Sequence, residues 1–406
     1  MAGRLVIVGA GQAAFAMAAK LRALKDERPI LILGEEPVLP YQRPPLSKKY
    51  LLGEMEFDRL LFRPEAWYAE NAVEIRLGVT VTRIDRAAKT VVLESGEAIS
   101  YETLALVTGA TPRRLPASAG GDLAGIYTMR SKADADRLAG EMQAGRRLLV
   151  IGGGYIGLEA AAVARKLGLE VTVIEMAPRI LQRVAAPETA RTMREIHEAE
   201  GVTIRENTGL RTLVGTDGHV SGAELSDGTV IPVDIVIAGI GVTANDRLAA
   251  EAGLETANGI VVDAFARTAD PAIYAAGDCT VLPWKGQRIR LESVQNAIDQ
   301  AEAAAAAMAG GSEPYEARPW FWSDQYEVKL QIAGFNLGYD ETLVRPGLKP
   351  DSSSVWYFRE GRLIACDAIN DARAYVVAKR MIELGITPDK SLVRDPEADL
   401  KALLKA

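Results

Sequence analysis

Two short glycine-rich segments of this sequence have the residue types and spacing that can hold a phosphate group. In the second, Gly152, Gly154 and Gly157 follow an apolar run at 148–151, and Glu175 ends another apolar run 23 residues after Gly152. The first glycine permits a tight turn, the second lets a pyrophosphate approach the backbone, and the third lets a helix pack closely on a strand. The N-terminus of that helix offers free N–H groups to an anion. The spacing therefore predicts a dinucleotide site in which Glu175 binds a ribose 2′-hydroxyl.

The first segment repeats this arrangement near the start of the chain. Gly9 and Gly11 follow the predicted strand 4–8, Ala14 stands at the last glycine position, and Glu35 follows the next predicted strand, 30–33. The motif permits alanine at that position. A chance repeat of glycines would need to be accompanied twice by a strand, a helix, a second strand and an acidic residue. Two such segments are therefore much more specific evidence for dinucleotide binding than one. Two dinucleotide sites in one chain mean that one cofactor can reduce the other. Such hydride transfer needs positioning rather than a general base.

The elements around these segments predict an α/β fold with parallel sheets. A strand at 268–277 delivers Asp278 to a sheet edge, where ligands of open α/β sheets bind, and an alanine-rich helix is expected over 291–308. Residues 73–93 are expected to form a small antiparallel excursion. Further elements are expected at 104–107, 187–200, 202–205, 220–225 and 233–238, followed from residue 315 by an aromatic-rich α+β region with a hairpin at 353–368 and a helix over 371–384.

A proline-rich segment at 41–48, YQRPPLSK, lies between the two fingerprints. Its paired prolines favour an extended backbone, and they are flanked by the basic residues Arg43 and Lys48. The segment is therefore expected either to lie rigidly along a ligand or to form a surface turn.

The composition is that of a globular chain long enough for two or three domains. Of its 406 residues 48% are hydrophobic and 25% are charged, and the formal net charge is −7. A chain of this charge is not expected to have nucleic acid as its main partner. Because the sequence has neither an apolar window of about eighteen residues nor a charged-then-apolar leader, we expect no membrane partner and a cytoplasmic location.

The cysteines and histidines exclude several kinds of chemistry. The two cysteines, Cys279 and Cys366, form no CxxC motif and fit a reducing compartment. The only histidines, His197 and His219, lie in no recognisable motif. We therefore expect no metal site and no acid–base catalysis by histidine.

Together these segments resemble the FAD-dependent and NADH-dependent ferredoxin reductases of bacterial oxygenase systems, including cytochrome P450 systems. The resemblance covers almost the whole chain and is carried by residues 9–14, 43–48, 108–109, 152–159, 239–241, 277–278, 292–294 and 319–324. It implies a glutathione-reductase-like fold. The implied domains are an FAD-binding domain formed by 1–112 and 242–316, an NAD-binding domain formed by 113–241, and a C-terminal α+β domain formed by 317–406.

The resemblance also assigns roles to individual residues. Lys48 and Glu159 would be the catalytic residues, with Lys48 near the isoalloxazine ring and paired with Glu159. The residues implied to bind FAD are Gly9, Gly11 and Ala13 at the pyrophosphate with Ala14 beside them, Glu35 at the ribose, Arg43 and Lys48 along the cofactor, Val81 at the adenine, Arg130 at the flavin, Gly277 and Asp278 at the ribitol, and Val294 at the pyrimidine edge. The residues implied to bind NADH are Gly152, Gly154, Tyr155, Ile156, Gly157, Glu175 and Gly241.

The resemblance implies a transient [2Fe-2S] ferredoxin as partner and a monomer or weak dimer. Related disulfide reductases place reactive cysteines beside the flavin, but residues 39–49 contain none. Electrons are therefore expected to leave one at a time towards an external metal centre. Trp322, counted among the cofactor-binding residues, and Trp320 either cover this exit or pack in a core. Lys285, Arg288 and Arg290 form either a cationic docking patch or a solvated loop.

Two alternatives remain open. One is a rubredoxin reductase or a monodehydroascorbate reductase, which share both cofactors. The other is a protein like apoptosis-inducing factor, in which the reductase fold serves as a redox-controlled interaction module.

Overall fold

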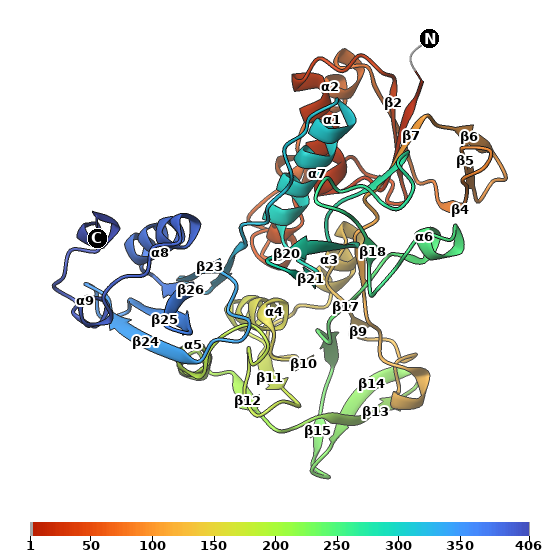
Figure 1. Ribbon diagram of the computed structural model, residues 1–406. Helices are drawn as coiled ribbons and strands as arrows, with labels where there is room; N and C mark the ends of the chain where they lie inside the picture. The colour runs from red at the N-terminus through yellow and green to blue at the C-terminus, as the bar shows by residue number, and fades with distance from the viewer. Residues whose placement is uncertain (1–2, 406) are drawn as a thin grey trace. The chain divides into compact units, whose positions relative to one another are not determined.

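The computed structural model describes residues 3–405, which fall into two compact units (Figure 1). The first unit comprises Met1–Gln42, Phe57–Thr111 and Val242–Pro319. The second unit comprises Arg43–Glu56, Pro112–Gly241 and Trp320–Ala406. Among residues 3–405, no helix is both long and apolar enough to span a membrane.

The first unit is built on a five-stranded parallel sheet in the order β19-β7-β1-β2-β3. Its central strands are continuous buried apolar runs, as expected when helices cover both faces of a parallel sheet. The strands are β1 (Leu5–Val8), β2 (Ile30–Gly34), β3 (Val73–Leu77), β7 (Thr103–Leu106) and β19 (Ile273–Ala275). This open parallel sheet confirms the predicted fold class.

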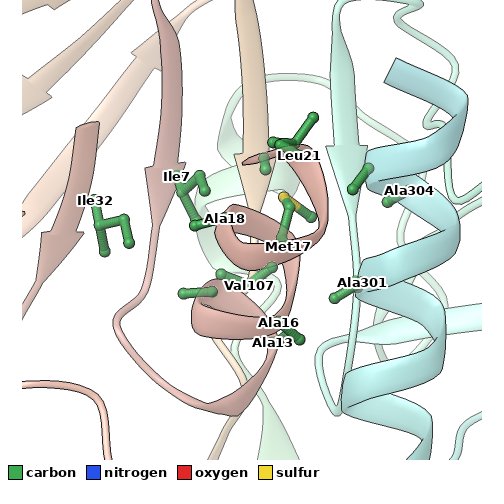
Figure 2. Close-up of a cluster of buried hydrophobic side chains, with 14 of the residues drawn as sticks. Ile7, Ala13, Ala16, Met17, Ala18, Leu21, Ile32, Val107, Ala301 and Ala304 are labelled. Atoms are coloured by element: carbon green, nitrogen blue, oxygen red, sulfur yellow. The ribbon is translucent and has the colours of Figure 1, made fainter. Parts of the chain in front are cut away.

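Two small-residue helices, α1 (Gln12–Ala23) and α7 (Val294–Met308), pack against each other in the first unit. Figure 2 shows side chains of Met17 in α1 and Ala301 and Ala304 in α7 facing one another, with Ile7 of the sheet on the side of α1 away from α7. All four are buried, so the alanines allow the two helices to approach closely over the sheet.

The remaining elements of the first unit surround this core. The prediction of an antiparallel excursion over 73–93 was wrong for 73–77, because β3 pairs in parallel with β2. The half-polar pattern of β3 is that of an edge strand, which sequence alternation does not distinguish from an antiparallel one. The other elements are β4 (Val81–Asp85), β5 (Thr90–Leu93), β6 (Ala98–Ser100), β8 (Ala110–Pro112), β17 (Val242–Ala244), β18 (Ile260–Val261), β20 (Thr280–Trp284), β21 (Gln287–Ile289), α2 (Glu65–Glu70), α6 (Arg247–Glu251) and η2 (Phe57–Leu60).

The second unit contains another five-stranded parallel sheet, in the order β12-β11-β10-β16-β9. Its strands are β9 (Ile126–Tyr127), β10 (Arg147–Ile151), β11 (Glu170–Ile174), β12 (Thr203–Arg205) and β16 (Ile235–Ala238). It is accompanied by α3 (Lys132–Ala139), α4 (Tyr155–Lys166), α5 (Pro187–Ala199), η3 (Ala117–Ala119), and the antiparallel strands β13 (Leu210–Thr216), β14 (His219–Leu225) and β15 (Val230–Pro232).

The C-terminal part of the second unit is an antiparallel sheet in the order β22-β23-β26-β25-β24. The predicted hairpin is formed by β25 and β26, and the predicted helix ends at Gly385, whose φ of 69° forms the left-handed cap. The elements are β22 (Trp320–Gln325), β23 (Val328–Gly334), β24 (Glu341–Pro346), β25 (Ser353–Arg359), β26 (Arg362–Ile369), α8 (Ala372–Leu384), α9 (Lys390–Arg394) and η4 (Ala402–Lys405).

The proline-rich segment departs from the expected extended backbone. Pro44–Ser47 forms a 3₁₀ helix, η1, and Arg43 before it is helical, with φ −76° and ψ −33°. The ring of proline fixes φ near −65°, a value that suits the first turn of a helix as well as an extended chain. Residues 43–56 belong to the second unit, whereas the predicted three-domain division assigns them to the FAD-binding domain. That division stays a prediction.

Candidate functional site

The first glycine loop has the backbone geometry that a pyrophosphate requires. Gly9 has φ +111°, and a Cβ there would lie 2.3 Å from the carbonyl oxygen of Val107, so only glycine fits. Gly11 precedes helix α1 without a side-chain cap, and within residues 3–405 a Cβ built on it meets no atom within 4 Å apart from its chain neighbours. The backbone at Gly11 and the first N–H groups of α1 are therefore open to an anion. Ala14 is fully buried and takes the third glycine position.

The same edge of the first sheet collects Gly277, Asp278 and Val294. Gly277 has φ +85°, and a Cβ there would lie 3.6 Å from the Cβ atoms of both Ala13 and Ala297. The segment after β19 therefore passes between the first turns of α1 and α7. Asp278 follows as a half-buried residue, and Val294 begins α7.

A buried glutamine fixes this segment. Gln300 accepts hydrogen bonds from the N–H of Gly277 and the hydroxyl of Thr280, both at 2.9 Å. Ser293 caps α7 by accepting from the N–H of Asn296 at 3.1 Å. Because the side chain of Ser293 occupies one N–H group only, the start of α7 keeps further donors for a ligand.

Glu35 and Val81 lie further along the same sheet. Glu35 is exposed directly after β2. The N–H of Val79 donates to the carbonyl of Gly34 at 2.9 Å, which holds the connection to β4 against the end of β2. Val81 is buried at the start of β4. The five segments implied to bind FAD in the first unit thus gather at the carboxyl edge of one sheet.

The second glycine loop repeats the geometry of the first. Gly152 has φ +104°, and a Cβ there would lie 2.4 Å from the carbonyl oxygen of Gly239. A Cβ on Gly157 would lie 2.3 Å from the carbonyl oxygen of Gly152, so this glycine allows α4 to pack on the loop. Gly154 precedes α4 without a side-chain cap, and in the described part of the chain a Cβ on it meets no atom within 4 Å apart from its chain neighbours. The loop therefore presents open backbone at a helix N-terminus.

The carboxylate of Glu175 is anchored to this loop. It accepts hydrogen bonds at 2.8 Å from the N–H of Gly153 and from the N–H of Ala177. Arg179, the nearby cation, donates to the carbonyl of Ala185 at 2.8 Å. Its guanidinium is therefore engaged by its own loop.

The other predicted NADH residues lie around the same helix start. Gly241 has φ +94° and follows β16, which neighbours β10 in the sheet. The side chain of Ile156 is 46% exposed at the beginning of α4. The hydroxyl of Tyr155 is buried without a hydrogen-bond partner among the described residues, and burial raises its pKa well above the usual value.

The ion pair implied by the resemblance is present in the second unit. The ammonium of Lys48 lies 2.8 Å from Oε2 of Glu159, and the two side chains are 18% and 6% exposed. The same carboxylate accepts from Ser47 at 2.9 Å and from Ser323 at 2.7 Å. Arg43 donates to the carbonyl of Arg130 at 2.8 Å, so these two predicted FAD residues are also neighbours.

Sequence reasoning missed Ser47 and Ser323. Ser47 was visible as the residue before Lys48 in the proline-rich segment. Ser323 lies in the aromatic run of β22, where side chains alternate between two faces. The small polar residue among aromatics was the signal that one face of this strand meets polar groups.

The tryptophans of β22 are not core residues. Trp320, Phe321 and Trp322 are each half-buried. The ring of Phe321 contacts Tyr155 at a centroid distance of 4.9 Å. Trp320 contacts Trp322 at 5.5 Å and lies under the ammonium of Lys379 at 5.0 Å. Of the two interpretations of Trp322, core packing is the less consistent with this partial exposure.

The expected cationic patch is largely neutralised within the first unit. Arg288 lies 2.8 Å from a carboxylate oxygen of Glu255, and Arg290 lies 2.6 Å from one of Glu292. The side chain of Arg290 is only 16% exposed. The pattern of basic residues in the sequence overstated the positive charge of this segment.

Both cysteines are fully buried. Burial raises the pKa of the Cys279 thiol and raises that of Cys366 well above its usual value. Because the thiolate is the nucleophilic form, neither side chain has the properties of a reactive thiol.

Comparisons with known proteins agree with this geometry. Residues 3–301 match the family described as pyridine nucleotide-disulphide oxidoreductase, and residues 320–404 match the family described as reductase C-terminal. A ferredoxin–NAD(P)⁺ reductase from Sphingomonas sp. is 42% identical over 401 residues, which cover 98% of this chain and 96% of that protein. A rubredoxin–NAD⁺ reductase from Pseudomonas putida is 40% identical over 368 residues, covering 90% of this chain and 95% of that protein.

The solved structures include the putidaredoxin reductase of a covalent putidaredoxin reductase–putidaredoxin complex. It is 38% identical, has a TM-score of 0.96, and the match covers 99% of this chain and 98% of that chain. The predicted resemblance, fold and redox-enzyme class, and the use of FAD and a nicotinamide nucleotide, are confirmed by these relatives. The two glycine loops and the sheets that carry them thus identify the chain as a member of the pyridine nucleotide-disulphide oxidoreductase family, and as an oxidoreductase.

Proposed function

We propose that this chain transfers electrons from NADH through FAD to a [2Fe-2S] ferredoxin that supplies an oxygenase such as a cytochrome P450. The observation that carries the proposal is the presence of two glycine loops with open backbone at helix N-termini, one in each unit. Each loop suits a pyrophosphate, and a chain with two such sites can bind two dinucleotides. The relatives named as ferredoxin reductases support the same function.

The residues of the first unit fit the FAD pyrophosphate and its flanking groups. A Cβ at Gly11 would meet no other part of the chain within 4 Å among the described residues, which leaves room for the phosphates. Bound FAD supplies the chemistry of the site, since it accepts a hydride and passes electrons on singly. We assign to FAD the residues Gly9, Gly11, Ala13, Ala14, Glu35, Val81, Gly277, Asp278 and Val294 of the first unit, and Arg43, Lys48, Arg130 and Trp322 of the second.

The second glycine loop fits NADH. The open backbone at Gly154 suits the pyrophosphate, and Glu175 still has lone pairs for a ribose hydroxyl after accepting its two backbone N–H groups. We assign to NADH the residues Gly152, Gly154, Tyr155, Ile156, Gly157, Glu175 and Gly241.

The Lys48–Glu159 pair has a positioning role at the flavin. With three hydrogen-bonding partners and little exposure, the Glu159 carboxylate holds the Lys48 ammonium in one place. A fixed cation orients groups and favours negative charge that develops beside it. No general base is required for hydride transfer, which fits the lack of a histidine at the glycine loops.

The electron acceptor is an external protein. Disulfide reduction requires a reactive cysteine, and both cysteines of this chain are buried. Ferredoxin is favoured as acceptor because the ferredoxin reductases match the chain over nearly its full length. Rubredoxin is the second candidate, since a rubredoxin reductase has a similar identity. We further propose a monomer or weak dimer in a reducing, cytoplasmic setting, which the two free thiols support.

An acceptor panel tests the proposal. The FAD-loaded protein is supplied with NADH, and kcat/KM is measured for a [2Fe-2S] ferredoxin, a rubredoxin and the monodehydroascorbate radical, with ferricyanide as a control for the NADH step. We expect the highest value for the ferredoxin. A higher value for rubredoxin would establish the second candidate, and activity with ferricyanide alone would reject both.

A further inference from the structure

A line of hydrogen-bonded side chains runs through the second unit to Glu159. Tyr326 Oη lies 3.0 Å from Nδ1 of His197, and Nε2 of His197 lies 2.7 Å from Oε1 of Gln325. Nε2 of Gln325 lies 3.0 Å from Oγ of Ser323, which lies 2.7 Å from Oε1 of Glu159. The three middle side chains, those of His197, Gln325 and Ser323, are at most 1% exposed. They therefore hydrogen-bond to each other rather than to water.

Each atom in this line has one hydrogen-bonding role. The amide oxygen of Gln325 can only accept, so Nε2 of His197 carries the hydrogen and Nδ1 accepts from Tyr326. The amide nitrogen of Gln325 donates to Ser323, whose own hydroxyl hydrogen is then directed at Glu159. Every bond points towards the carboxylate, and bonds aligned in this way strengthen one another.

The line requires a neutral imidazole at His197, its second member. Burial lowers the pKa of His197, which keeps Nδ1 free to accept. The charged groups acting on Tyr326 are Glu200 and Arg165, and burial raises its pKa far above the physiological range. The directions of the hydrogen bonds are therefore stable around neutral pH.

Three elements converge to build the line. Glu159 projects from α4, His197 from α5, and Ser323 and Gln325 from β22. Ser323 and Gln325 are two residues apart, so they point to the same face of the strand. Phe321 shares that face and contacts α4 through Tyr155. The first strand of the C-terminal sheet thus delivers a hydroxyl to a carboxylate of the nucleotide-binding helix.

We propose that Ser323 is a positioning residue for the Lys48–Glu159 ion pair, with Gln325 and His197 fixing the direction of its hydroxyl. The inference rests on the proposed function, in which this pair acts at the flavin. The last torsion of a glutamate side chain is broad, so the carboxylate plane is set by its partners. Oε2 of Glu159 is held by Lys48 and Ser47, whereas Ser323 is the partner of Oε1. Without Ser323 the carboxylate can rotate and the ammonium can follow it.

Removal of the hydroxyl tests this role against a matched control. Ser323→Ala is compared with Ser354→Ala, a fully buried serine in β25 that accepts from Trp356 at 3.0 Å. The rate constant of flavin reduction by NADH is measured by stopped-flow absorbance. We expect about a tenfold fall for Ser323→Ala, no change for Ser354→Ala, and less than about a twofold change in the NADH concentration at half-maximal rate. Ser323→Thr, which keeps the hydroxyl, should restore most of the rate.

A double-mutant cycle shows whether Ser323 acts through Glu159. In a Glu159→Gln background, Ser323→Ala should change flavin reduction by less than about twofold, because the group that it positions is altered. Equal rates for Ser323→Ala and Ser354→Ala, or fully additive effects with Glu159→Gln, would overturn the proposal.

A chemical readout separates this proposal from the proposed function. Acetylation of Lys48 in the FAD-loaded protein, followed by mass spectrometry, reports how firmly its ammonium is held. We expect faster labelling of Lys48 in Ser323→Ala than in Ser354→Ala. If Glu159→Gln leaves flavin reduction unchanged, the assigned role of the ion pair fails, yet faster labelling still supports positioning by Ser323. Equal labelling in the two serine variants would refute it.

Discussion

The carboxylate of Glu175 accepts a hydrogen bond from the backbone N–H of Gly153 at 2.8 Å, which ties the predicted ribose ligand to the glycine loop. An ionised carboxylate in this place accepts from a ribose 2′-hydroxyl and repels a 2′-phosphate. Arg179 is the cation nearby that could favour a 2′-phosphate, but its bond to the carbonyl of Ala185 directs it to its own loop.

We therefore predict a preference for NADH over NADPH. The value of kcat/KM, measured with ferricyanide as acceptor, should be at least about tenfold higher for NADH, equivalent to about 1.4 kcal/mol. Arg179→Ala should leave the preference intact, since its guanidinium already donates to the carbonyl of Ala185 in its own loop. Equal values for the two nucleotides in the unmodified protein would contradict the assignment of Glu175.

Substitution of two glycines in the same loop should affect two different properties, NADH binding at Gly154 and folding stability at Gly152. Gly154 has φ −82° and open space around its Cβ position, so Gly154→Val should fold normally and raise the KM for NADH by about tenfold or more. Gly152 has φ +104° and faces the carbonyl of Gly239, so Gly152→Ala should lower the free energy of unfolding by about 1–3 kcal/mol from backbone strain alone.

The measurements for this pair are the thermal unfolding midpoint and the KM for NADH. A destabilised Gly154→Val, or a Gly154→Val variant with an unchanged KM, would argue against a pyrophosphate at this backbone.

Neither thiol should take part in turnover. Cys279 and Cys366 are buried, and burial raises the pKa of each. Cys279→Ala/Cys366→Ala should keep NADH-dependent ferricyanide and ferredoxin reduction, measured per bound FAD, within about twofold of the unmodified protein. Loss of turnover in a variant that still binds FAD would place the chain with the thiol-dependent reductases.

Asp367 should make the second unit less stable at high pH. The carboxylate is buried and accepts from Thr189 at 2.7 Å and from the hydroxyl of Tyr357. Burial raises the pKa of Asp367 from 3.8 to about 6 in the folded chain. The folded state therefore binds a proton more tightly than the unfolded state. The stability from this group is present below about pH 4 and is lost as the pH rises through about 6.

Asp367→Asn removes this pH dependence. The amide oxygen can still accept from Thr189 and Tyr357, and no charge is buried. At pH 8 the variant should be more stable than the unmodified protein by up to about 3 kcal/mol, and at pH 5 the difference should be much smaller. Unfolding midpoints at both pH values check this, with exposed Asp217→Asn as the control. A destabilised Asp367→Asn at pH 8 would show that the carboxylate is needed in its ionised form.

Local patterns explain why much of the fold could be predicted. The two glycine loops, their flanking strands and the helix that ends at Gly385 depend on residues a few positions apart, so spacing and backbone freedom are sufficient to identify them. The strand β3 was assigned to the wrong kind of sheet because its parallel pairing with β2 depends on a neighbour over forty residues away.

The proline-rich segment shows the limit of local rules. Proline fixes φ but leaves ψ to the surroundings, and Pro44–Ser47 became a 3₁₀ helix. The charges of Arg288 and Arg290 were similarly visible in the sequence, whereas their pairing with Glu255 and Glu292 required the folded chain.

The sequence by itself determined the family, the two nucleotide loops and the absence of a reactive cysteine pair, since these follow from residue type and short-range spacing. Only the tertiary structure decided which groups meet Glu159. Ser323 is 164 residues away from it and Ser47 is 112 residues away, and no periodicity relates them. Hydrogen bonds between such distant residues form only when the packing of helices and sheets brings their elements together. The pattern of residues within one segment does not specify which other segment it will pack against.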